Sequence, residues 1–128
     1  MAKGIFGIVL GLCLGWLWTA ANAQEKSELW RQGQEVYIAN CADCHRSNGE
    51  GLSDIFPALQ KEPFVVGNPQ PLIQLILEGK KAKVGHMPAW KNTLTDQQIA
   101  AVVTFIRQSW GNQAEAVTAE MVAKNRKK

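Results

Sequence analysis

Apolar residues recur at helical spacing in three segments of the chain, residues 27–40, 71–78 and 96–110. Within each segment the apolar positions follow one another three or four residues apart, which is the period of an α-helix with one buried face. The middle segment is short and almost continuously apolar, so it should be mostly buried. The residues between the segments lack the alternating pattern of strands. The sequence therefore predicts an all-α domain with three main helices and long loops.

The residues at the ends of the three segments support these boundaries. Ser27 is the predicted N-cap of the first helix, and Pro71 suits the first turn of the second helix, which Gly79 would end. Thr95 precedes the third segment, and the Gln98 side chain three residues later can complete a capping box. We therefore expect the third helix to begin directly after Thr95.

Gly33 and Tyr37 lie four residues apart, on one face of the first predicted helix. A glycine lets another backbone approach closely. We therefore expect this face to cross the last helix at residues 102–106, with Phe105 packed against Tyr37. These side chains are predicted to belong to the core and not to a reactive site.

Residues 1–23 have the pattern of an export signal. Lys3 precedes an apolar run over residues 4–18, and the sequence Ala-Asn-Ala ends at Ala23 with small residues where a signal is cut. We predict cleavage after Ala23 and a periplasmic protein that begins at Gln24. Retention of the run as a membrane anchor is the alternative, because residues 19–21 would lengthen it toward the roughly 20 residues that span a bilayer.

The rest of the chain is predicted to be one domain, residues 24–111, followed by a tail, residues 112–128. The tail is polar, ends in a basic run and can form a short helix after Thr118. Chain ends of this composition are usually solvated. We therefore expect the tail to lie outside the core.

Cysteine count and charge exclude several classes of protein. The sequence has three cysteines, and removal of the signal takes Cys13, so no structural disulfide framework can form. The formal net charge of +3 at pH 7 is too small to indicate a nucleic acid or a membrane surface as partner. Membrane contact is therefore expected only through partner proteins, or through an uncleaved signal.

The remaining cysteines form the sequence C-x-x-C-H with Cys41, Cys44 and His45. A thioredoxin-like pair would need a preceding strand, and here a helical pattern precedes. A zinc site would need His86 as a fourth ligand beside the two cysteines and His45. A further alternative is a disulfide between Cys41 and Cys44 beside a surface histidine. C-x-x-C-H is the signature of covalent haem attachment, in which two thiols bind the haem vinyl groups and the imidazole binds the iron. One motif predicts one haem c per chain.

From Lys26 to Trp110 the sequence resembles the small monohaem class I cytochrome c family, whose iron has histidine and methionine ligands. The resemblance implies the cytochrome c fold, with three main helices and long loops wrapped around one covalently bound haem. It assigns His45 to the iron. It also implies that a proline carbonyl accepts the second ring N–H of this histidine, and Pro57 is the candidate for that contact.

The resemblance also implies a methionine as the sixth ligand of the iron, in a loop after the middle helix. Met87 fits, because Pro88 follows it and indicates a loop. Of the other methionines, Met1 leaves with the signal and Met121 lies in the tail. His86 remains the rival ligand, because imidazole also binds haem iron.

Coordination determines the expected function. With His45 and Met87 on the iron, no position is open for a substrate, so the resemblance implies a one-electron carrier and not an enzyme. Its partners would be redox proteins, such as a dehydrogenase, an oxidase or another cytochrome, and Lys80, Lys81 and Lys83 can steer an acidic partner. The alternatives are a fixed cytochrome c subunit of a larger dehydrogenase or terminal oxidase complex, and an enzyme or gas sensor with a labile sixth ligand.

Overall fold

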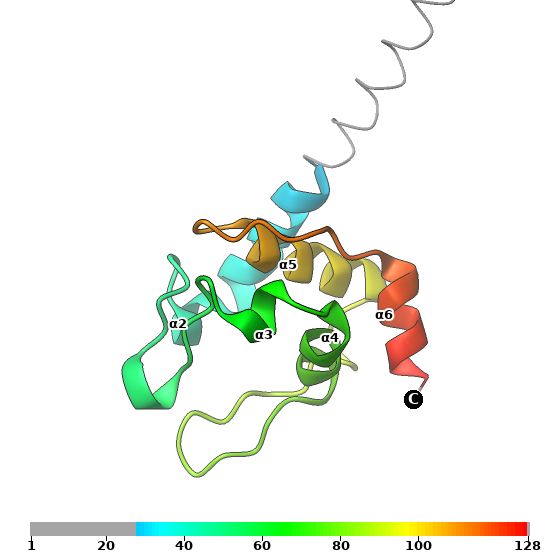
Figure 1. The fold of residues 1–128 in the computed structure, drawn as a ribbon. Coiled ribbons are helices and arrows are strands. Elements are labelled where there is room, and N and C mark those ends of the chain that lie inside the picture. The colour runs from blue at the N-terminus through cyan, green and yellow to red at the C-terminus, as the bar shows by residue number, and fades with distance from the viewer. Residues whose placement is uncertain (1–27, 128) are drawn as a thin grey trace, which may run out of the picture.

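The computed structural model describes residues 28–127, in which helices are joined by long loops and isolated β-bridges replace strands (Figure 1). The predicted all-α fold class is confirmed. The predicted signal at residues 1–23 and the predicted N-cap Ser27 lie outside the described residues. Residues 28–40 are helical, and the elements that follow are α2 (Ala42–His45), the 3-10 turn η1 (Ser53–Ile55), α3 (Pro63–Val66), α4 (Pro69–Glu78), α5 (Asp96–Gln108) and α6 (Ala119–Arg126).

Helix α4 begins two residues earlier than the sequence predicted. The Asn68 side chain accepts a hydrogen bond from the backbone N–H of Gln70 at 3.1 Å, and Pro69 occupies the first turn. The cap therefore lies before both prolines of this helix. Gly79 ends the helix as predicted, with a φ of 69°.

Helix α5 has the predicted capping box at its start. The Thr95 hydroxyl accepts from the N–H of Gln98 at 3.2 Å, and the Gln98 side chain accepts from the N–H of Thr95 at 3.0 Å. The helix ends at Gln108, two residues before the predicted end. Its backbone is extended at Ser109, whose hydroxyl donates to the carbonyl of Phe105 at 2.6 Å.

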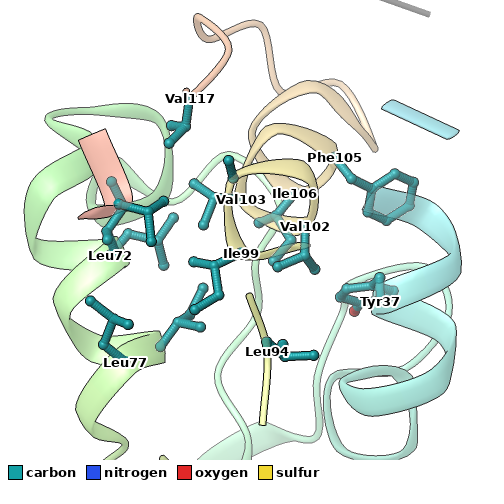
Figure 2. Packing of buried hydrophobic residues seen from close by; sticks show 14 of the residues in the cluster. Tyr37, Leu72, Leu77, Leu94, Ile99, Val102, Val103, Phe105, Ile106 and Val117 are labelled. Atoms are coloured by element: carbon teal, nitrogen blue, oxygen red, sulfur yellow. The ribbon is translucent and has the colours of Figure 1, made fainter. Parts of the chain in front are cut away.

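Helix α5 lies at the centre of the core, and all its residues from 99 to 107 are buried. Figure 2 shows α4 on one side of it, with Leu72 and Leu77, and the helix over residues 28–40 on the other side, with Tyr37. Each neighbour buries a different face of α5. Because both outer helices pack on it, α5 fixes the position of the loops that leave them.

The crossing of α5 with the helix over residues 28–40 depends on Gly33. A Cβ added to Gly33 would lie 2.0 Å from the carbonyl oxygen of Ala101 and 2.7 Å from the Cβ of Phe105. The predicted contact of Phe105 with Tyr37 is confirmed, with ring centroids 5.2 Å apart. The closest backbone belongs to Ala101, one residue before the predicted face, because Ala101 and Phe105 share one side of α5.

The segment after α5 packs on the core, which differs from the solvated tail expected from the sequence. Val117 and Val122 are fully buried, and the backbone N–H of Val117 donates to the Thr104 hydroxyl at 2.9 Å. The buried Arg107 guanidinium donates to the carbonyl of Glu115 at 3.1 Å. The expected short helix is present as α6, and Figure 1 shows the chain running past α5 to reach it. Buried valines and hydrogen bonds to α5 together hold this segment in place.

Candidate functional site

The two cysteines and the histidine of the C-x-x-C-H sequence lie on a single helical turn. Cys41 precedes α2, and its carbonyl accepts from the backbone N–H of His45 at 2.9 Å and from that of Cys44 at 3.3 Å. The turn continues from the helix over residues 28–40, since the N–H of Cys41 donates to the carbonyl of Tyr37 at 2.8 Å. Both thiols are free and half-buried. Three groups that can bind one cofactor are therefore fixed by local helical structure.

Burial raises the pKa of the Cys41 thiol. Cys41 packs against the hydrophobic core cluster, and this burial, with a smaller effect from Cys44, raises the pKa of the Cys41 thiol to about 12. The thiolate is the reactive form of cysteine. As long as no bond to a cofactor has formed, the Cys41 side chain is therefore a neutral thiol at neutral pH, which fits its apolar environment.

The imidazole of His45 is oriented by a backbone carbonyl. Its Nδ1 lies 3.0 Å from the carbonyl oxygen of Pro57, a distance at which a protonated Nδ1 donates a hydrogen bond. In that tautomer Nε2 carries the free lone pair, which is the form that binds a metal ion. The backbone around His45 is also held, because the N–H of Gly51 donates to the carbonyl of His45 at 3.0 Å.

Gly51 makes the contact between Pro57 and His45 sterically possible. Its φ is 66°, and a Cβ added to it would lie 2.2 Å from the carbonyl oxygen of Phe56 and 2.6 Å from that of Pro57. A side chain here would push both carbonyls away. Sequence reasoning did not identify Gly51, although a glycine six residues after the histidine is the signal that could have shown it.

Met87 lies in a loop whose base is tied to the end of α4. Its backbone N–H donates to the carbonyl of Lys80 at 3.0 Å, and its carbonyl accepts from the N–H of Lys80 at 2.9 Å. The Met87 side chain is half-buried and packs against the core cluster, whereas His86 is exposed. Neighbouring side chains in extended backbone point to opposite sides. Of the two candidate ligands, Met87 is thus the one on the inner side.

The loop of Met87 meets the loop that carries Pro57. A Cβ added to Gly85 would lie 2.3 Å from the carbonyl oxygen of Ile55, so the two loops are in backbone contact. Beside this contact, large apolar side chains are exposed: 40% for Ile55, 41% for Leu52 and 66% for Val84. An apolar group held by both loops would cover such side chains. The Nε2 atom of His45, which is a free donor when Nδ1 carries the proton, the two thiols on the same helical turn and this apolar surface together fit a haem.

The other sites considered for the cysteines lack support in the structure. Within residues 28–127 no three histidine, cysteine, aspartate or glutamate side chains are grouped to hold one metal ion, so the zinc ligands considered are not assembled there. The residues before Cys41 are helical, which differs from the strand that a thioredoxin-like pair follows. Across the same range, none of the helices has the length and apolar character needed to span a bilayer.

Comparison with known proteins agrees with the haem motif. The family model described as cytochrome c oxidase, cbb3-type, subunit III matches residues 28–106. The chain is 41% identical to the gluconate 2-dehydrogenase cytochrome c subunit of Pantoea cypripedii over 84% of its own length and 26% of that protein. It is 42% identical to the cytochrome c subunit of the quinone alcohol dehydrogenase of Gluconacetobacter polyoxogenes, over 73% of this chain and 22% of that subunit.

A smaller relative matches along most of both chains. Cytochrome c-552 of Thermus thermophilus is 32% identical, over 75% of this chain and 85% of that protein. The chain spans only about a quarter of the length of the two dehydrogenase subunits. The similarity to those subunits therefore concerns one part of each.

Proposed function

Because this chain belongs to the cytochrome c family described as cytochrome c oxidase, cbb3-type, subunit III, we propose that it is a periplasmic one-electron carrier. Proteins of this family carry covalently bound haem c and transfer electrons. We assign the thioether bonds of the haem to Cys41 and Cys44, and the axial ligands of the iron to His45 and Met87. The single C-x-x-C-H sequence gives one haem per chain.

The observation that carries this assignment is the contact of His45 with Pro57, on a loop that touches the loop of Met87. The Pro57 carbonyl, 3.0 Å from Nδ1, keeps the ring proton on that nitrogen and leaves Nε2 for the iron. The half-buried Met87 would supply a neutral thioether as the second protein ligand. Haem, when bound, supplies one-electron exchange between ferric and ferrous iron. If His45 and Met87 both bind the iron, no position on the metal would be left for a substrate.

The surface beside Met87 suits an acidic redox partner. Lys80, Lys81 and Lys83 are exposed, and the backbone pairing of Lys80 with Met87 brings this basic group next to the proposed ligand. Ile55 and Val84 add exposed apolar surface on the same two loops. Lysines around an apolar centre would speed the encounter with a negatively charged partner. Replacing all three lysines by glutamine should slow electron transfer to such a partner at low salt, and an unchanged rate would refute the steering role.

A second candidate function is that of a fixed cytochrome c subunit in a larger complex. The similarity to subunits of gluconate 2-dehydrogenase and of the quinone alcohol dehydrogenase favours it. Purification from the native source without detergent separates the two proposals. A carrier elutes as a single chain, and a subunit elutes with its complex.

Periplasmic location follows from the export signal predicted at residues 1–23. Sequencing the N-terminus of the mature protein tests it. Gln24 as the first residue supports cleavage after Ala23. Met1 or Ala2 on a membrane-bound protein would establish an anchor instead.

The ligand assignment is tested by two matched variants of neighbouring residues. Ferric haem with a thioether ligand has a weak charge-transfer band in the near infrared, so the oxidised wild type should show this band. Met87→Ala should abolish it, lower the reduction potential and allow carbon monoxide to bind the ferrous iron, because the ligand that favours ferrous iron is lost. His86→Ala should change none of the three, since that side chain is exposed. A wild type that binds carbon monoxide readily would favour a sensor or an enzyme.

A further inference from the structure

Residues 90–96 lead from the Met87 loop into α5, whose first residue is Asp96, and they are held from two sides. On one side, backbone N–H groups of this segment donate to the end of α4. The N–H of Trp90 donates to the carbonyl of Ile76 at 3.0 Å, and that of Lys91 donates to the carbonyl of Leu77 at 3.2 Å. The last carbonyls of a helix have no partner within the helix. The chain after Met87 thus caps α4.

On the other side, one arginine of α6 binds three groups of the same segment. The Arg126 guanidinium donates through Nε to the carboxylate of Asp96 at 2.6 Å and through Nη2 to the carbonyl of Leu94 at 3.1 Å. Its Nη1 donates to the carbonyl of Lys91. The rigid, planar fork of arginine can hold several acceptors at once, which the single ammonium of a lysine cannot do in the same geometry.

Arg126 is itself well anchored. Val122, one turn earlier in α6, is fully buried against the core, and the neighbouring Asn125 donates to the carbonyl of Met121 at 2.9 Å. The side chains of Arg126 and Asp96 are only 29% and 34% exposed. Their ion pair is therefore better shielded from water than a fully exposed pair, and it is supported by two further hydrogen bonds.

We propose that Arg126 is a positioning residue for Met87, through which the C-terminal helix determines how easily the sixth ligand leaves the iron. The proposal rests on the assignment of Met87 in the proposed function. Lys91 is only four residues from Met87 and is bound by α4 through its N–H and by Arg126 through its carbonyl. Displacement of Met87 by another ligand requires the loop to move away from the haem. A loop whose end is fixed on both sides resists that movement.

The experiment compares Arg126→Gln with Lys124→Gln in the haem-containing protein. Both variants remove one positive charge from α6. Within residues 28–127, however, Lys124 pairs only with Glu120, at 2.8 Å, and both of these side chains are more than 70% exposed. Imidazole is added to the ferric protein, and loss of the near-infrared band reports displacement of Met87. We expect half-displacement of Met87 in Arg126→Gln at an imidazole concentration about tenfold lower than in the wild type, which corresponds to about 1.4 kcal/mol. Lys124→Gln should behave as the wild type.

Two further variants keep the test decisive. Arg126→Lys retains the charge beside Asp96 and should give an intermediate midpoint. Asp96→Asn leaves Arg126 in place without its carboxylate partner, so it should shift the midpoint in the same direction by a smaller factor, even if Arg126→Gln does not fold. The unfolding free energy of each variant is measured in parallel.

The outcomes separate this inference from the proposed function. An Arg126→Gln protein with a lower unfolding free energy but an unchanged imidazole midpoint would overturn the positioning role, because the residue would then be structural only. A wild type without the near-infrared band would overturn the assignment of Met87 itself. A band that is present in the wild type and lost at lower imidazole concentration only in the Arg126 and Asp96 variants supports both.

Discussion

The position of the Pro57 carbonyl beside His45 can be tested through Gly51, without changing either residue. Gly51→Ala adds a Cβ that would lie 2.2 Å from the carbonyl oxygen of Phe56 and 2.6 Å from that of Pro57. Ordinary contact of a Cβ begins at 3.4 Å. The backbone at Phe56 and Pro57 would therefore have to move by about 1 Å, which lengthens the hydrogen bond to His45 beyond its normal range.

The expected loss of stability has three contributions. A side chain at a φ of 66° costs about 1–2 kcal/mol. Crowding of the backbone costs about 1–3 kcal/mol, and loss of one hydrogen bond costs about 0.5–1.5 kcal/mol. These contributions overlap, so we expect the free energy of unfolding to fall by about 3–4 kcal/mol. The matched control is Gly111→Ala, which has a φ of 85° but whose Cβ would come no closer than 3.2 Å to the end of the Lys61 side chain. It should lose only about 1–2 kcal/mol.

The same variant should raise the reduction potential. The carbonyl of Pro57 makes the His45 imidazole a stronger electron donor, which favours ferric iron. If about 0.5–1 kcal/mol of this hydrogen bond depends on the oxidation state, its loss raises the potential by about 20–40 mV. The assays are denaturant unfolding of the haem-containing protein and an equilibrium redox titration. A Gly51→Ala protein that is no less stable than Gly111→Ala, and has the wild-type potential, would refute the role given to the Pro57 carbonyl.

Two other predictions follow from the haem motif and from the C-terminal segment. Cys41→Ala and Cys44→Ala should each retain haem through one thioether under denaturing extraction, whereas the double variant should lose it. Mass spectrometry of the chain measures the retained haem. A wild type that loses its haem in the same treatment would contradict covalent attachment. Val117→Ala should lower the free energy of unfolding by about 2 kcal/mol, because the side chain is fully buried; a loss below about 0.5 kcal/mol in denaturant titration would mean that this segment is solvated.

Local patterns in the sequence were sufficient for the start of α5 but not for the short elements. Thr95 and Gln98 lie three residues apart, and the side chain of each accepts a hydrogen bond from the backbone N–H of the other. Their contact therefore does not depend on the rest of the fold. Helix α3 and turn η1 contain only four and three residues, which is too short for any hydrophobic period to appear. The stretch between the first two predicted helices, which was expected to be a long loop, therefore also contains these two short elements.

The candidate site divides in the same way into local and distant parts. Cys41, Cys44 and His45 share one helical turn, so their grouping follows from the motif alone. The contact of the two loops, at Ile55 and Gly85, joins residues 30 positions apart and is set by how α4 and the segment after it pack. No spacing rule in a single sequence contains that information, and a resemblance to a family was needed to suggest which methionine would bind the iron together with His45.

The C-terminal segment shows why composition misled the prediction at this end of the chain. Polar and basic residues dominate it, but burial depends on a few positions, here Val117 and Val122, which are fully buried. The acceptors that Arg126 finds are a carboxylate and two carbonyls near the start of α5, about 30 residues away in the sequence. Arg126, which the sequence placed in a solvated end, thus makes contacts within the protein. Its partners lie in the segment that follows Met87, the proposed iron ligand. The charge of a tail therefore predicts its environment only when the chain has no complementary carbonyls and carboxylates within reach.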